Sequence, residues 1–195
     1  MKLLSTPMLM LKLGPLILTV NLFFSISAIA ESKYEEKTKE IIKGELRKFI
    51  FSEDIKTLPK LVVLDSDESV VEFGYKKDIS VINFWATWCA PCKKEMPSLN
   101  NLAENMKHDD VRIITVASGR NSKEAIDAFF TDNNLGNLNK FRDPRGKMAM
   151  IYGVTALPTT VVIDPTGREI GRIIGDIDWN TADIRTFFRK LMTTN

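Results

Sequence analysis

Short runs rich in β-branched and aromatic residues recur along the chain and are typical of strands. They predict strands at 61–65, 69–73, 81–86, 111–117, 159–164 and 169–174. A polar turn separates the first two runs, and the turn DPTG separates the last two, so each pair is expected to be antiparallel. The run VINFWA at 81–86 is nearly all apolar, as in a central strand buried on both faces.

Residues 90–106 (APCKKEMPSLNNLAENM) supply helix formers directly after the predicted central strand. Pro91 lies early in this helix, where a missing amide donor costs little. Pro97 lies deeper, where we expect a kink. The helix therefore begins within the sequence Cys-Ala-Pro-Cys.

Further helices are predicted on the C-terminal side of this segment. Asn121 and Glu124 form a capping box for the first of them, and a short helix is expected at 148–152. Asn180 is the predicted cap of a last amphipathic helix that ends at Met192. Strands and helices alternate through the middle of the chain, which indicates an α/β fold with parallel strands.

The N-terminal residues predict export. Lys2 and Lys12 precede an uncharged apolar run at 13–30, long enough to approach the thickness of a bilayer as a helix. Ala28 and Ala30 form the small-x-small pattern of a signal-peptidase site. Both a cleaved signal peptide and a retained membrane anchor remain open, and both place the rest of the chain outside the cytoplasm.

Three segments follow from these patterns: a signal peptide or anchor at 1–30, a charged tether with an amphipathic helix at 31–57, and a folded domain at 58–195. The first segment holds two of the 27 Lys and Arg residues and none of the 25 Asp and Glu residues, so the exported part is electrically balanced. No basic stripe favours nucleic acid as a partner.

The chain has only two cysteines, Cys89 and Cys92. A bridge between them closes so short a loop that it stabilises the fold by only about 2 kcal/mol in the chain-entropy description. A thiol in the first helical turn has a lowered pKa, so Cys89 is predicted to be partly ionised near neutral pH, exposed and nucleophilic. Cys92, one turn further in, could then resolve a mixed disulfide with a client.

Two structural alternatives explain the pair less well. An inert bridge would contribute little stability, for the reason of loop length. A structural zinc site needs four ligands, whereas the chain offers two cysteines and the single His108, which we expect at the surface among charged neighbours. No metal or cofactor is predicted beyond the dithiol itself.

The stretches FWATWCAPCKKEMP and ALPTTVVIDPTG, with the terminal helix, resemble exported thioredoxin-like reductases of the TlpA and ResA type over 58–195. The resemblance implies a three-layer α/β/α thioredoxin-like fold with a mixed central sheet, an N-terminal β-hairpin extension and an N-terminal helix. It also implies that Pro158 is cis and lies against the dithiol, where the backbone of Leu157 pairs with the client chain.

The same resemblance suggests roles for residues around the motif. Trp88 would form part of the apolar docking face, and Ala90 and Pro91 would set the reduction potential. Asn83 stands where cytoplasmic thioredoxin has an acid, and it is given an orienting role, with an ordinary hydrogen-bonded strand residue as the alternative. Glu95 could couple electrostatically to the dithiol, although a helix-surface carboxylate beside two lysines is the more common outcome.

Trp85 is expected to pack in the core.

The leading hypothesis is a periplasmic or cell-envelope thiol-disulfide oxidoreductase that reduces disulfides of client proteins. By resemblance, the clients are apocytochrome c or copper-site assembly proteins, and the electrons come from a membrane donor of the CcdA/DsbD type. Two alternatives remain: a disulfide-forming oxidant of the DsbA kind, and a Cu(I)-handling module with both cysteines as soft ligands.

Overall fold

The computed structural model describes residues 34–53, 56–75 and 77–193, so the predicted targeting segment at 1–30 lies outside the described residues. The strands are β1 (Phe49–Phe51), β2 (Leu61–Leu64), β3 (Val70–Phe73), β4 (Ile79–Trp85), β5 (Val111–Ser118), β6 (Phe141–Asp143), β7 (Thr159–Ile163) and β8 (Glu169–Ile174). The helices are α2 (Ala90–Met106), α3 (Lys123–Asp132), α4 (Lys147–Ile151) and α5 (Ala182–Met192), with 3-10 segments at Lys39–Ile41 and Gly44–Lys48.

The strands form one mixed sheet in the order β1-β8-β7-β4-β5-β6-β2-β3. The parallel part consists of β4, β5 and β6, whereas β7 is antiparallel to β4 and β8 is antiparallel to β7. Every residue of β4 is buried, which confirms it as a central strand. The two predicted hairpins are also confirmed, and β2–β3 extends the far edge of the sheet beyond β6.

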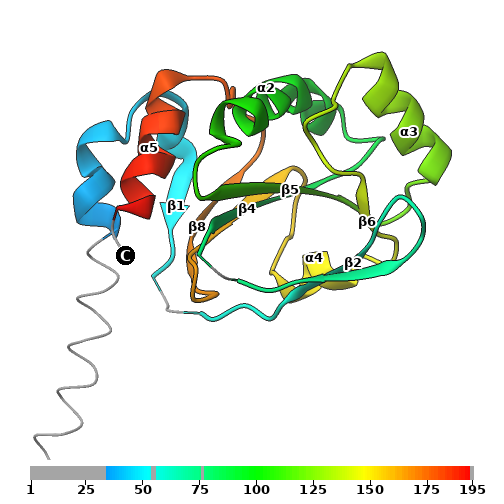
Figure 1. The fold of residues 1–195 in the computed structure, drawn as a ribbon, viewed down its shortest axis with the longest axis horizontal. Coiled ribbons are helices and arrows are strands. Elements are labelled where there is room, and N and C mark those ends of the chain that lie inside the picture. The colour runs from blue at the N-terminus through cyan, green and yellow to red at the C-terminus, as the bar shows by residue number, and fades with distance from the viewer. Residues whose placement is uncertain (1–33, 54–55, 76, 194–195) are drawn as a thin grey trace, which may run out of the picture.

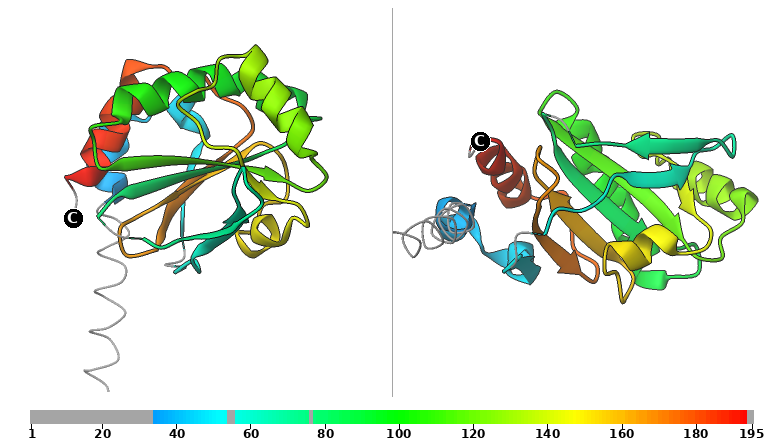
Figure 2. Two further views of the ribbon diagram at one scale, coloured as in Figure 1. Left: turned by 45° about the vertical axis from the view of Figure 1, so that its right-hand side comes forward. Right: turned by 90° about the horizontal axis from the view of Figure 1, so that it is seen from below.

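Helices cover both faces of the sheet, which confirms the three-layer arrangement. Helices α2, α3 and α5 lie over one face, and α4 lies over the other (Figures 1 and 2). Side chains of β4 alternate between the two faces. Val81 and Trp85 join the core under α2 and α5, whereas Ile82 and Phe84 join the core under α4.

The N-terminal part of the domain differs from its prediction. The continuous helix expected before residue 49 is instead a helical turn at 34–38, two 3-10 segments and β1, which pairs with β8. Gly44 interrupts the helix because its φ of 54° lies in the left-handed region. The ring of Phe49 packs edge-on against the ring of Phe187 in α5, with the ring centroids 4.9 Å apart. The local hydrophobic periodicity does not reveal this contact.

Both predicted helix caps are wrong by one residue. Ser122 caps α3 by accepting a hydrogen bond from the amide of Ala125, and Thr181 caps α5 in the same way. A hydroxyl follows the asparagine in each case, and it occupies the extended backbone position that a cap requires. The side chain of Asn121 is therefore available for other contacts.

Pro97 lies inside α2, which continues through it. Among the described residues, no helix combines the length and apolar character needed to cross a membrane.

Candidate active site

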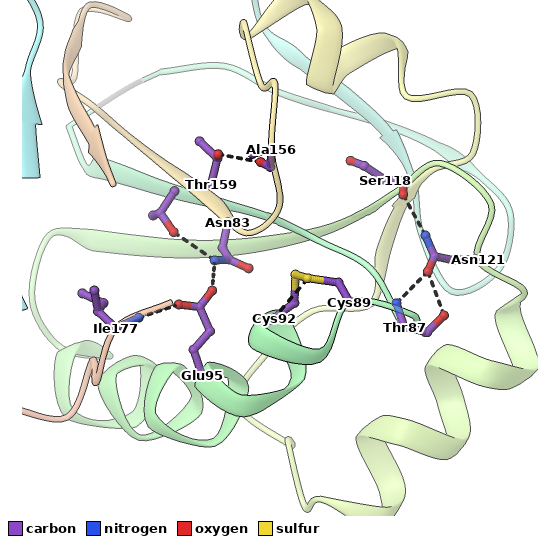
Figure 3. The surroundings of a disulfide bond; sticks show 11 residues. Asn83, Thr87, Cys89, Cys92, Glu95, Ser118, Asn121, Ala156, Thr159 and Ile177 are labelled. Atoms are coloured by element: carbon purple, nitrogen blue, oxygen red, sulfur yellow. Dashed lines mark hydrogen bonds between the residues drawn. A yellow bond between two sulfur atoms is a disulfide. The ribbon is translucent and has the colours of Figure 1, made fainter. Parts of the chain in front are cut away.

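Cys89 and Cys92 form a disulfide at the junction between β4 and α2 (Figure 3). The turn after β4 is closed by a 3.1 Å hydrogen bond from the amide of Cys89 to the carbonyl of Ala86. Cys89 is the N-cap of α2, and its Sγ accepts a 3.3 Å hydrogen bond from the amide of Cys92. The sulfur of Cys89 therefore lies at the positive end of the helix dipole, as the sequence predicted.

The two sulfurs differ in their access to solvent. Cys89 is 6% exposed and Cys92 is 0% exposed. The sequence predicted an exposed Cys89, and the structure corrects this: in the disulfide form, Cys89 is buried and lines a cavity. The order of access is nevertheless the predicted one, because Cys92 lies behind Cys89 in the helix.

A cavity of about 480 Å³ lies over Cys89. Its lining residues are Trp88, Cys89, Pro91, Ser118, Gly119, Ala149, Val154, Thr155, Ala156 and Leu157. None of these side chains is charged, and most are apolar. We call this cavity the client cleft, because we propose below that client proteins bind there.

The peptide bond between Leu157 and Pro158 is cis, as the resemblance implied. Pro158 is buried, and its carbonyl accepts a 2.8 Å hydrogen bond from the amide of Gly175. The hydroxyl of Thr159 donates to the carbonyl of Ala156 at 2.7 Å (Figure 3). These bonds fix the segment that carries Leu157 into the wall of the client cleft.

Glu95 is not on the helix surface but is 2% exposed beneath the dithiol, one helical turn after Cys92. Its Oε1 accepts a 2.8 Å hydrogen bond from Nδ2 of Asn83, and its Oε2 accepts from Nε1 of Trp179 at 2.9 Å and from the amide of Ile177 at 3.3 Å. The segment between β8 and α5 supplies the last two donors and covers this face of α2. We call these four residues the carboxylate network.

Burial raises the pKa of Glu95 to about 7, although the hydrogen bonds from Trp179, Asn83 and Ile177 oppose the shift. The charge of Asp176 adds a smaller upward contribution. Near neutral pH this carboxyl can therefore both accept and release a proton.

Asn83 is fully buried and bridges two elements: its Nδ2 donates to Glu95 and, at 2.9 Å, to Oγ1 of Thr160 in β7. Its Oδ1 has no hydrogen-bond partner among the described residues. The sequence identified Asn83 and Glu95 separately but did not identify Trp179 or Thr160. The scarcity of tryptophan, with three in the chain, is the one sequence signal that could have drawn attention to Trp179.

The other two tryptophans have opposite surroundings, as predicted. Trp85 is 1% exposed and stacks near Phe129, with ring centroids 5.4 Å apart. Trp88 is 65% exposed beside Cys89 and forms the outer rim of the client cleft.

His108 is exposed beyond the far end of α2, and no cluster of potential metal ligands is found in the described part of the chain.

A Cys-x-x-Cys disulfide at a helix N-terminus, beside a cis-proline loop and on a mixed sheet with helices on both faces, defines the class of thioredoxin-like thiol-disulfide oxidoreductases. A model of the AhpC/TSA family matches residues 54–168, and the chain belongs to this family.

Named relatives and a solved structure agree with this class. The chain is 36% identical to the thiol-disulfide oxidoreductase ResA of Bacillus anthracis over 130 residues, which are 62% of this chain and 69% of the relative. It is 34% identical to the thiol:disulfide interchange protein HelX of Rhodobacter capsulatus, over 55% of this chain and 57% of the relative. The crystal structure of the pneumococcal exposed lipoprotein thioredoxin Etrx1 from Streptococcus pneumoniae matches with a TM-score of 0.57 and 26% identity, over 66% of this chain and 98% of that one.

Proposed function

We propose that this protein reduces disulfide bonds of client proteins outside the cytoplasm, with Cys89 as the nucleophile and Cys92 as the resolving thiol. The observation that carries the proposal is the unequal position of the two sulfurs. Cys89 lines the client cleft at the start of α2, whereas Cys92 is completely buried behind it. A client sulfur can therefore approach the first cysteine and not the second.

The reaction begins from the dithiol form. The Cys89 thiolate attacks one sulfur of the client disulfide, a mixed disulfide forms, and the other client sulfur leaves as a thiolate that takes up a proton. Cys92 then loses its proton and attacks Sγ of Cys89. The second client thiol is released, two electrons have passed to the client, and the Cys89–Cys92 disulfide seen in the structure remains.

The client cleft has the composition that an extended peptide with apolar side chains would fit. Trp88 offers a large exposed apolar surface at its rim, and Leu157 lies on the wall formed by the cis-proline loop. In this proposal the backbone of Leu157 pairs with the client chain, and Pro158 holds that backbone in place. Ala90 and Pro91 lie between the cysteines and adjust the reduction potential.

The carboxylate network contains a proton acceptor, Glu95. The amide side chain of Asn83 cannot take this role. Cys92 must lose a proton in the interior, because its side chain is completely buried. Glu95 lies one turn along the same helix, and its pKa of about 7 suits it to receive that proton. Asn83 orients the carboxylate by donating to its Oε1 at 2.8 Å.

The direction and the clients are proposed from the resemblance. We propose that apocytochrome c or copper-site assembly proteins are the clients and that a membrane protein of the CcdA/DsbD type re-reduces the dithiol. Residues 1–30 would be removed after export, or the apolar run at 13–30 would hold the domain at the membrane surface. The Streptococcus relative, which is described as an exposed lipoprotein, supports a location outside the cytoplasm.

The reduction potential of the Cys89/Cys92 couple tests the direction. We expect equilibration with dithiothreitol buffers to give a value below about −230 mV, more reducing than the glutaredoxin range. A value near the DsbA potential of about −120 mV would instead make the protein an oxidant. Sub-micromolar binding of Cu(I) by the reduced protein in equilibrium dialysis would favour the copper-handling alternative.

A further inference from the structure

The side chain of Asn121 connects the turn at Thr87 with the end of β5 at Ser118 (Figure 3). Its Oδ1 accepts hydrogen bonds from the amide of Thr87 at 2.8 Å and from the Thr87 hydroxyl at 2.9 Å. Its Nδ2 donates to the carbonyl of Ser118 at 2.9 Å and to that of Gly119 at 3.4 Å. Asn121 is 9% exposed and is not among the residues that line the cleft.

These contacts join two neighbouring segments that follow the adjacent parallel strands β4 and β5. Thr87 immediately precedes Trp88 and Cys89, which form the rim and the reactive point of the cleft. Ser118, the last residue of β5, and Gly119 after it also line the cleft. Both ends of the amide of Asn121 are therefore engaged, and a change in either backbone segment breaks at least one of its bonds.

The backbone of Asn121 is also held by Arg142, a residue of strand β6. Nη1 of Arg142 donates to the backbone carbonyl of Asn121 at 3.3 Å, and Nη2 of the same guanidinium bonds Glu68 in the β2–β3 turn. The Arg142 side chain is 13% exposed. The loop that carries Asn121 is thus held between the hairpin at the sheet edge and the turn that leads to the nucleophile.

We propose that Asn121 is a positioning residue for client recognition: it holds the Thr87–Trp88–Cys89 turn at a fixed distance from the Ser118–Gly119 segment and so keeps the client cleft open in one shape. This inference rests on the proposed reductase function. Asn121 touches neither sulfur. It therefore acts on reactions that need the cleft, and not on the reactivity of the thiolate.

The test compares Asn121→Ala with Asn100→Ala. Asn100 is also 9% exposed, and its Oδ1 likewise accepts a hydrogen bond from a loop amide, that of Asn137 at 2.9 Å, but it does not line the cleft. The protein is kept reduced by dithiothreitol and turned over either with insulin, whose disulfides must enter the cleft, or with oxidised glutathione, a small disulfide. The rate without protein is subtracted. The free energy of unfolding of both variants is measured to confirm comparable folding.

For Asn121→Ala we expect kcat/KM toward insulin to fall about tenfold, mainly through KM, because bonds to two segments are lost. The rate with oxidised glutathione should stay within about twofold, as should both rates of Asn100→Ala. Should Asn121→Ala fail to fold, Thr87→Val, which removes only the hydroxyl bond, should raise KM for insulin about threefold. An unchanged rate with insulin, or equal losses with both disulfides, would overturn the inference.

A second readout needs no client. Nuclear spin relaxation of the Trp88 indole N–H should show a lower order parameter in Asn121→Ala than in the unchanged protein and in Asn100→Ala. If the unchanged protein reduces no insulin at all, the proposed function fails, and the indole measurement still decides whether Asn121 holds the turn. An order parameter that is equal in all three proteins would contradict the positioning role.

Discussion

The two ends of the disulfide have different surroundings. Cys89 faces a cleft with no charged lining residue, and Trp88 offers exposed apolar surface beside it. Cys92 is fully buried one turn before Glu95, which is held by Asn83 and Trp179. In the function that we propose, one short motif thus separates two tasks: the cleft side receives a client by shape and apolar contact, while the interior side accepts the proton of Cys92.

Replacing the cysteines one at a time should give the largest difference between the two sides of the disulfide. Cys92→Ala should accumulate a stable mixed disulfide through Cys89, because no resolving thiol remains. Cys89→Ala should form no adduct, because the buried Cys92 cannot reach a client. Non-reducing electrophoresis with an insulin substrate, followed by mass spectrometry, measures both. Equal trapping by the two variants would contradict the assigned roles.

Replacing Glu95 should change how stability depends on pH. Burial raises the pKa of this carboxyl from 4.5 to about 7, so between these values the folded state binds a proton that the unfolded state releases. The contribution of Glu95 to the free energy of unfolding is complete below about pH 4.5. It is lost as the pH rises through 7, and the free energy of unfolding then falls by roughly 3 kcal/mol. Glu95→Gln should lack this loss.

Urea unfolding of the oxidised protein at pH 5 and pH 8 measures this difference. Glu104→Gln serves as the control, since Glu104 is an exposed carboxylate on the same helix, and it should retain the pH dependence of the unchanged protein. An undiminished loss of stability between the two pH values in Glu95→Gln would show that another group is responsible.

Trp179→Phe tests the carboxylate network by removing one hydrogen-bond donor to Glu95. The lost bond should cost about 1 kcal/mol more at pH 8, where the carboxylate is charged, than at pH 5. Trp85→Phe is the matched control, because Trp85 is equally buried and its Nε1 has no partner among the described residues. The loss in free energy of unfolding caused by Trp85→Phe, measured by urea unfolding, should be the same at both pH values. A pH-independent cost for Trp179→Phe would argue against a charged acceptor.

Trp88→Ala should have the smallest effect and should act only on the cleft side. We expect kcat/KM toward insulin to fall about fivefold, with the free energy of unfolding changed by less than about 0.5 kcal/mol, because the side chain is exposed. Met150→Ala, which removes an apolar side chain that is 73% exposed but does not line the cleft, is the control. Similar losses in both variants would indicate a general surface effect.

The sequence predicted the parts of this site that are local in the chain. The strand at 81–86 and the helix that follows placed Cys89 at a helix start. The stretches FWATWCAPCKKEMP and ALPTTVVIDPTG, with the terminal helix, carried the resemblance that implied the cis bond before Pro158. It did not predict the burial of Glu95. That burial depends on Trp179, 84 residues away along the chain, whereas the adjacent lysines indicated a surface position.

The misplaced caps have the same physical origin. Asn121 and Asn180 are good cap residues by type, but a hydroxyl one position later takes that role in each helix. The Oδ1 atom of Asn121 instead accepts hydrogen bonds from Thr87, 34 residues before it. This contact exists only in the folded chain, so the local pattern could not predict it.

The most direct measurement is the rate at which iodoacetamide alkylates each thiol of the freshly reduced protein at pH 7, read by peptide mapping. The account predicts that Cys89 reacts faster than free cysteine, while Cys92 stays unlabelled until Cys89 is consumed or the protein unfolds. Equal, slow labelling of both sites, at the rate of free cysteine, would contradict the division between an accessible nucleophile and a protected resolving thiol.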